Sequence, residues 1–210
     1  MAHRIQLEIE RKFDVGSDIT IPDTVGIGAI AVAEPPVVTE LVAVYYDTAD
    51  LALGAARTAL RRREGGADAG WHLKVAEPGA EGRTEHHWPL TDGEAVPAEV
   101  VDAVRDTVAD APLRPVARVA NRRETVLLSD AAGYPVAEFC DDHVEALDLR
   151  TGVERRWREW EVELQAAAPD DAAGRAALLA ALTRAVEAVG GRPSASESKL
   201  ARALGVDPMP

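Results

Sequence analysis

The sequence has 210 residues, of which 47% are hydrophobic and 28% charged, a composition typical of a globular domain with a real core. The formal net charge is −13, which argues against a broad nucleic-acid-binding surface because such surfaces are positively charged. The single cysteine, Cys140, excludes an internal disulfide and a thiolate metal cage. No apolar stretch precedes Glu8 and none is long enough to span a bilayer, so we expect a cytoplasmic protein without a membrane partner.

The residue pattern predicts alternating short strands and helices. Residues 4–15 form the first expected strand, and a Gly- and Pro-rich connection follows, with a short helix near Asp23–Ile30. Further strands, rich in β-branched and aromatic residues, are expected at 37–47, 59–64, 71–76, 83–90, 116–129, 135–140, 143–149 and 155–164. Apolar spacing predicts helices over 96–109, 170–189 and 196–204, with a turn or short helix at 49–56.

About eight strands, joined mostly as consecutive hairpins with helices between them, indicate an α+β fold. Such an order favours a closed or nearly closed antiparallel β-barrel. We expect one domain over residues 1–205, followed by a short C-terminal tail at 206–210.

Charged residues alternate with apolar residues along several of these strands. In the first strand Glu8, Glu10 and Lys12 share one face, because side chains alternate along extended backbone. A single strand of this kind typically turns its polar face to water. If the sheet closes, however, the charged faces line an interior, where charges of both signs persist only with partners or a charged ligand.

The two signs of charge point to two kinds of ligand. Basic residues match a polyanion, which arginine grips in bidentate fashion; they are Lys12, Arg61, Arg63, Lys74, Lys199 and one of Arg122 and Arg123, whose side chains point in opposite directions. Carboxylates match a hard divalent cation; they are Glu8, Glu10, Glu161 and Glu163. Together these residues describe a metal–polyphosphate site.

At this point the sequence resembles a known family. The motifs occur in the order Glu8-x-Glu10-x-Lys12, Tyr45-Tyr-Asp-Thr48, Arg61-x-Arg63, His72-Leu-Lys74, Glu161-Val-Glu163 and Ser198-Lys199. This ordered set is similar to that of the CYTH superfamily, the triphosphate tunnel metalloenzymes, over residues 3–204. The resemblance implies an eight-stranded antiparallel β-barrel tunnel with helices packed outside, and action on triphosphates with Mg²⁺ or Mn²⁺.

The resemblance also implies roles for individual residues. Metal binding would fall to Glu8, Glu10, Glu161 and Glu163, with Glu138 and Asp142 adding acidic character near the metals. The triphosphate would be held by Lys12, Arg61, Arg63, Lys74, Lys199 and Arg122, which we prefer to Arg123. The expected catalytic residues are Lys12, Glu161 and Glu163. Because Lys12 lies near other cations, we expect its pKa to be lowered, so that it helps to activate water.

The first hypothesis is therefore a hydrolase that cleaves inorganic tripolyphosphate to phosphate and diphosphate. A second is an organic triphosphatase or a class IV adenylyl cyclase-like enzyme, for which Trp71, Trp88, Tyr45 and Tyr46 could offer stacking. A third is a polyphosphate-binding module without turnover.

The last predicted helix also resembles the CYTH part of proteins that continue into a helical CHAD domain. A stand-alone protein and part of a longer one both stay open. The expected partner is a triphosphate or polyphosphate small molecule, with no nucleic acid, and the protein is expected to be a monomer or a homodimer.

Overall fold

A computed structural model describes residues 3–76, 79–196 and 198–206 of the chain. One antiparallel sheet dominates the fold, with its strands in the order β1-β7-β6-β5-β4-β8-β9-β10-β2-β11, while β3 pairs with β8 beside this path. The strands are β1 (Arg4–Glu8), β2 (Glu10–Asp14), β3 (Val32–Ala33), β4 (Val37–Asp47), β5 (Thr58–Glu64), β6 (Gly70–Ala76), β7 (Arg83–Pro89), β8 (Arg114–Ser129), β9 (Pro135–Asp148), β10 (Glu154–Leu164) and β11 (Arg192–Pro193).

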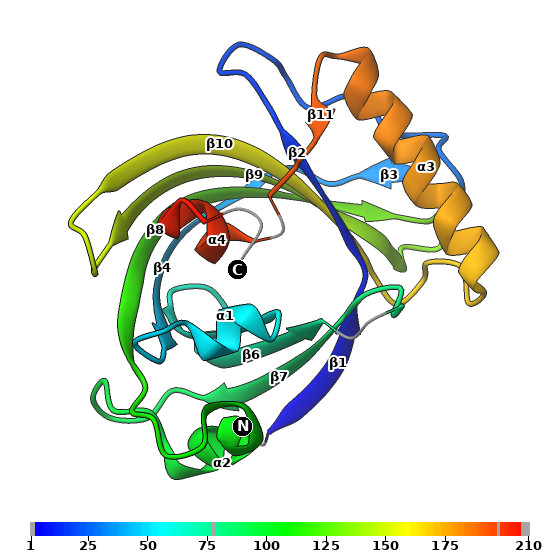
Figure 1. The fold of residues 1–210 in the computed structure, drawn as a ribbon. Coiled ribbons are helices and arrows are strands. Elements are labelled where there is room, and N and C mark those ends of the chain that lie inside the picture. The colour runs from blue at the N-terminus through cyan, green and yellow to red at the C-terminus, as the bar shows by residue number, and fades with distance from the viewer. Residues whose placement is uncertain (1–2, 77–78, 197, 207–210) are drawn as a thin grey trace.

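The first strand joins the two sides of the sheet. β1 and β2 are the halves of one extended segment that is interrupted only at Ile9. β1 pairs with β7, whereas β2 pairs with β10 at the other side of the sheet. The sheet therefore curls into a barrel, as Figure 1 shows. With β1 and β2 counted together, the described residues contain eight long strands, and the predicted α+β antiparallel barrel is confirmed.

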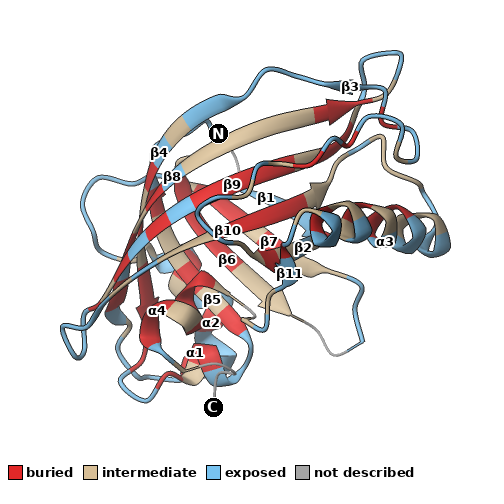
Figure 2. Ribbon diagram, turned by 90° about the horizontal axis from the view of Figure 1, so that it is seen from above, coloured by how far each residue is buried: buried red, intermediate tan, exposed pale blue. Residues whose placement is uncertain are grey.

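The helices cover the sheet at different places. They are α1 (Ala52–Ala55), α2 (Ala98–Val108), α3 (Ala172–Ala188) and α4 (Lys199–Leu204). α2 packs Val100 and Val104 against Trp71 on the outer face, and α3 packs Leu182 against Trp160 on another part of that face. α1 and α4 lie across one end of the barrel (Figures 1 and 2).

The alternation along β10 explains how the two faces of the barrel divide. Trp160 and Val162 are fully buried and belong to the apolar cluster that α3 covers. Glu161 and Glu163, between and beyond them, therefore point to the opposite side, into the barrel. The sequence places apolar residues where helices cover the sheet and carboxylates where the sheet encloses space.

Two expectations about the elements are wrong. The predicted helix near Asp23–Ile30 is a series of turns, because Gly26 and Gly28 have φ of +88° and +57°, which a right-handed helix does not allow. The two strands predicted at 135–140 and 143–149 are the single strand β9. Asp141 and Asp142 do not break it, since each carboxylate pairs with an arginine on a neighbouring strand.

Two further expectations concern the C-terminal tail and the membrane. Residues 207–210 of the expected tail lie outside the described residues. Of the helices that the structure describes, none combines the length and apolar character needed to cross a membrane.

A buried carboxylate holds α1 at the end of the barrel. Asp47 has no exposed surface and accepts hydrogen bonds from the backbone N–H groups of Thr48 (2.7 Å), Leu53 (2.9 Å) and Gly54 (3.0 Å). We expect Asp47→Ala to leave these donors unsatisfied and to lower the free energy of unfolding by about 3 kcal/mol, measured by urea denaturation. The exposed Asp92→Ala is the control, and an equal effect of the two substitutions would contradict this assignment.

Candidate functional site

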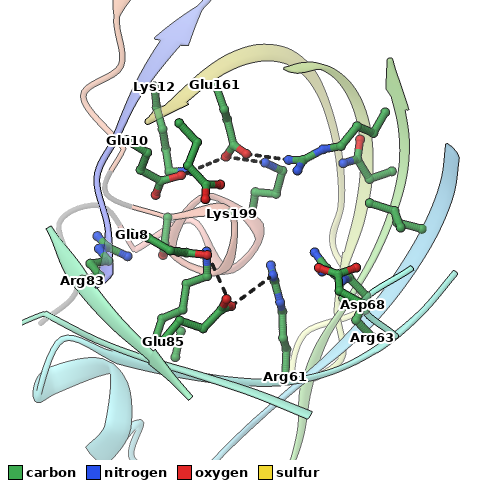
Figure 3. A pocket seen from close by; sticks show the side chains of 18 of the residues that line it. Glu8, Glu10, Lys12, Arg61, Arg63, Asp68, Arg83, Glu85, Glu161 and Lys199 are labelled. Atoms are coloured by element: carbon green, nitrogen blue, oxygen red, sulfur yellow. Dashed lines mark hydrogen bonds and ion pairs between the residues drawn. The ribbon is translucent and has the colours of Figure 1, made fainter. Parts of the chain in front are cut away.

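The barrel encloses a cavity of about 220 Å³ whose walls carry charges of both signs. Figure 3 shows the side chains converging on this space from strands on all sides. The charged lining residues are Glu8, Glu10, Lys12, Arg61, Arg63, Asp68, Lys74, Arg83, Glu85, Arg123, Glu138, Glu161, Glu163 and Lys199. The sequence contains only three lysines, and all of them line this cavity. The closed sheet therefore gathers the cations that the sequence separates by many residues.

The centre of the basic group is the carboxylate of Glu161. It accepts hydrogen bonds from Lys12, from Lys199 at 2.7 Å and from Arg123 at 2.5 Å. Burial opposes ionisation of Glu161, but these three cations outweigh it and hold its pKa well below the usual range. One carboxylate thus ties together β2, β8, β10 and the start of α4.

The expected pKa of Lys12 is wrong in direction. Burial disfavours the charged form of Lys12, but Glu10 and Glu161 outweigh it and raise its pKa above the usual value. The ammonium of Lys12 lies 3.1 Å from the nearer oxygen of Glu10. Carboxylates rather than other cations are its nearest charged neighbours, so Lys12 stays protonated and is not a base for water.

A second group of charges lies on the side of β6 and β7. The ammonium of Lys74 contacts Glu8, and Glu85 lies 3.8 Å from both Lys74 and Arg61. The buried ring of His72 contacts Glu85 through Nδ1 at 3.0 Å. Burial opposes ionisation of Glu85, but His72, Lys74 and Arg61 together lower its pKa. Glu85 therefore acts as a fixed counter-charge that holds two cations against the cavity.

The preference for Arg122 over Arg123 is corrected. Arg123 points inward and forms a bidentate pair with Asp142, at 2.8 and 2.6 Å. Arg122 points outward, keeps 46% of its side chain exposed and lies 3.9 Å from Glu124. The two residues are adjacent on β8, so only one could face the lumen.

The acidic residues differ in whether they have a partner. Asp142, Glu159 and Glu161 bring oxygens within 4.8 Å of one another, a group that could hold a metal ion. The ammonium of Lys199 lies among these three carboxylates, at 2.5–2.8 Å from each. Asp142 is fully buried behind the cavity wall and holds Arg123 and Lys199 in place.

Glu163 is the carboxylate whose surroundings fit a cation best. Within the described chain it makes no hydrogen bond or ion pair, and it faces Glu8, Glu10 and Glu138. Burial and then the charge of Glu8 raise the pKa of Glu163 to about 7, with smaller contributions from Glu10 and Glu138. Oxygen ligands that repel one another are the donor set that a hard divalent cation relieves, so these four residues fit such an ion.

Some lining residues were not expected from the sequence. They are Gln6, Asp68, Asn121 and Gln165. Gln6 continues the alternation of Glu8 and Glu10 and could have been found from it, whereas Asp68 lies in a loop without periodicity. The four aromatic residues considered for stacking lie in two places. Tyr45 lines the cavity, whereas the outer apolar cluster under α2 contains Tyr46, Trp71 and Trp88.

Known proteins are similar to this chain in sequence and in fold. An uncharacterised protein of Mycobacterium tuberculosis is 42% identical in an alignment that covers 95% of this chain but 40% of the relative. The chain thus spans about two fifths of the length of the curated relatives it matches.

Two solved structures share the fold. A proposed adenylate cyclase from Bacillus halodurans superposes with a TM-score of 0.61 at 21% identity, covering 94% of this chain and 97% of that chain. A proposed adenylyl cyclase from Hippeastrum, with a dominant triphosphatase activity, superposes with a TM-score of 0.50 at 15% identity, covering 96% and 97%. The model of the CYTH domain matches residues 6–187, and the chain therefore belongs to the CYTH domain family.

Proposed function

We propose that this protein is a metal-dependent triphosphatase that cleaves inorganic tripolyphosphate to phosphate and diphosphate. One observation carries the proposal: a single cavity combines a group of carboxylates around Glu163, which itself has no partner among the described residues, with seven lysine and arginine side chains. Phosphate oxygens are the ligands that both the cations and a carboxylate-bound divalent metal attract.

The lining favours an inorganic triphosphate over a nucleotide. Among the described residues Tyr45 is the one aromatic residue at the cavity wall, and it is almost fully buried. A base or thiazole ring would need a stacking surface, and three of the four aromatic candidates lie in the outer core instead. The triphosphatase activity of the Hippeastrum protein is in keeping with turnover of a triphosphate in this fold.

In this proposal, Glu8, Glu10, Glu138 and Glu163 would hold a divalent cation, Mg²⁺ or Mn²⁺, and Glu161 lines the same cavity. Such an ion neutralises charge on phosphate oxygens and lowers the pKa of a bound water. The residues of the chain do the rest by position and charge. Lys12, Lys199 and Arg123 bind the phosphate oxygens on which charge builds up, and Arg61, Arg63 and Lys74 align the remaining phosphates.

The reaction needs little covalent chemistry from the protein. Water attacks the terminal phosphorus in line, the P–O bond to the bridging oxygen breaks, and diphosphate leaves with that oxygen. The proton of the attacking water passes to a carboxylate or to solvent, since Lys12 holds its own proton. Lys12 is thus proposed to bind and stabilise the developing charge and not to activate water.

Two alternatives stay part of the comparison. A polyphosphate-binding module would need the cations alone, so the carboxylates around the unpaired Glu163 favour the enzyme. An organic triphosphatase or cyclase-like activity would need a further site for the organic group. The relatives are longer than this chain, and a CHAD domain in the remaining part is a proposal. The cytoplasmic location, the monomeric or dimeric state and the absence of a nucleic-acid partner are proposals as well.

The first test measures phosphate release from tripolyphosphate, ATP and thiamine triphosphate with Mg²⁺, Mn²⁺ or no metal. We expect metal-dependent release from tripolyphosphate, reduced about 100-fold or more in Lys12→Ala because a charge at the reacting phosphate is lost. Arg122→Ala is the matched control, since it removes an exposed cation of the same barrel. Tight tripolyphosphate binding without release from any substrate would favour the binding module.

The second test uses the raised pKa of Glu163. A metal ion binds the carboxylate form, so protons compete with the metal below the pKa of about 7. We expect the affinity for Mn²⁺ to fall by up to about tenfold per pH unit below pH 7 and to level off above it. In Glu163→Gln the affinity should be lower at pH 8 and nearly independent of pH between 6 and 8. Calorimetric titration checks this, and an unchanged pH profile in the variant would remove Glu163 from the metal site.

A further inference from the structure

Arg63 differs from Arg123, its neighbour in the cavity, in the kind of partner it has. Arg123 pairs with the buried carboxylates of Asp142 and Glu161 on strands β9 and β10. The side chain of Arg63 is 8% exposed, and its guanidinium contacts Asp68, whose side chain is 46% exposed and belongs to the loop between β5 and β6. Among the described residues no other carboxylate lies within ion-pair distance of Arg63.

The barrel therefore places a positive charge at Arg63 whose ion-pair partner, among the described residues, lies in a loop and not on a strand of the barrel. Burial, Arg61 and Arg123 lower the pKa of Arg63 to about 9, so its guanidinium lies in surroundings that disfavour its charge. An anion at this position relieves that repulsion. The anion that contacts Arg63 in this structure is the carboxylate of Asp68, and Figure 3 shows the two residues together at the edge of the cavity.

The backbone of Asp68 is held while its side chain can move. The carbonyl oxygen of Asp68 lies 2.9 Å from Nε2 of His72 and 3.2 Å from Nε2 of His87. The loop enters through Gly65 and Gly66, with φ of +83° and +73°, so its path depends on two residues that tolerate this backbone. Rotation of the Asp68 side chain alone, at a partly exposed position, would free Arg63 without unfolding the loop.

We propose that Asp68 is a specificity-determining residue, an internal anion that occupies Arg63 until a strongly charged phosphate chain displaces it. This inference rests on the proposed function, because it concerns the anion that the same cavity binds. A triphosphate that reaches Arg63 replaces one carboxylate by phosphate oxygens with more charge and a bidentate geometry. A weakly charged anion gains too little at Arg63 to displace Asp68, so the contact filters ligands by charge.

The test compares binding of tripolyphosphate to the wild-type protein and three variants, by calorimetry in buffer freed of metal on a chelating resin. In Asp68→Asn the competitor is lost, and the Kd for tripolyphosphate should fall about five- to tenfold. Asp68→Glu keeps the carboxylate and should bind within about twofold of wild type. Glu64→Gln is the matched control: it removes an exposed carboxylate from the end of β5 that pairs with Arg62, and its Kd should not change.

The possible results separate this inference from the proposed function. Tighter binding by Asp68→Asn alone supports the inference. Binding by wild type with an equal or higher Kd in Asp68→Asn overturns it and leaves the triphosphatase proposal standing. Absence of tripolyphosphate binding by wild type and Asp68→Asn alike also overturns the inference, whereas the proposed function stands or falls on metal-dependent phosphate release, which is measured separately. Urea denaturation of each variant verifies that it is folded under the binding conditions.

Discussion

The site depends on the contacts between the carboxylate of Glu161 and the three cations around it. It is almost fully buried, yet it stays ionised because Lys12, Lys199 and Arg123 surround it. These cations come from three separate elements, and a buried charge without such partners would destabilise the fold by several kcal/mol. The contacts that stabilise the ionised carboxylate therefore also hold β2, β8 and α4 together around the cavity. Stability and site geometry have one origin here.

The continuity of residues 4–14 has a second consequence for the site. Because β1 pairs with β7 and β2 pairs with β10, Glu8 lies beside the group of Lys74 and Glu85, and Glu10 lies opposite Glu163. The two carboxylates are two residues apart in sequence and belong to different sides of the sheet. The residues that close the barrel thus place these carboxylates between the two groups of cations.

The part of the site that could be predicted is the part that alternation determines. Glu8, Glu10 and Lys12, and likewise Glu161 and Glu163, face the cavity as their spacing requires, since a side-chain period of two is a property of the strand itself. Properties that depend on register or on distance could not be read in this way. Arg122 and Arg123 are adjacent on one strand, and the sequence does not say which of them faces inward. The pairing of Arg123 with Asp142 across β8 and β9 turns Arg123 toward the cavity.

The prediction of a lowered pKa for Lys12 was wrong, and Asp68 was not identified, for related reasons. A lowered pKa was expected because Lys12 was grouped with the other cations of the expected phosphate site, but the fold puts the carboxylates of Glu10 and Glu161 nearer to it. Asp68 lies in a loop, where no period links sequence to orientation, so only the three-dimensional path of residues 65–69 brings it to Arg63.

Carboxylates and cations in one cavity impose a condition on what it can bind. A free triphosphate would gain at Lys12, Lys199 and Arg123 but would meet the charge of Glu163 and its neighbours, while a free metal ion would meet the opposite combination. A metal and a triphosphate bound together satisfy both groups, and each then strengthens the binding of the other by the same factor, as linkage requires. Glu163, which has no partner among the described residues, would gain from the metal, and Arg63, whose partner Asp68 is partly exposed, would gain from the phosphate. The arrangement is therefore better suited to a metal–phosphate complex than to either component alone.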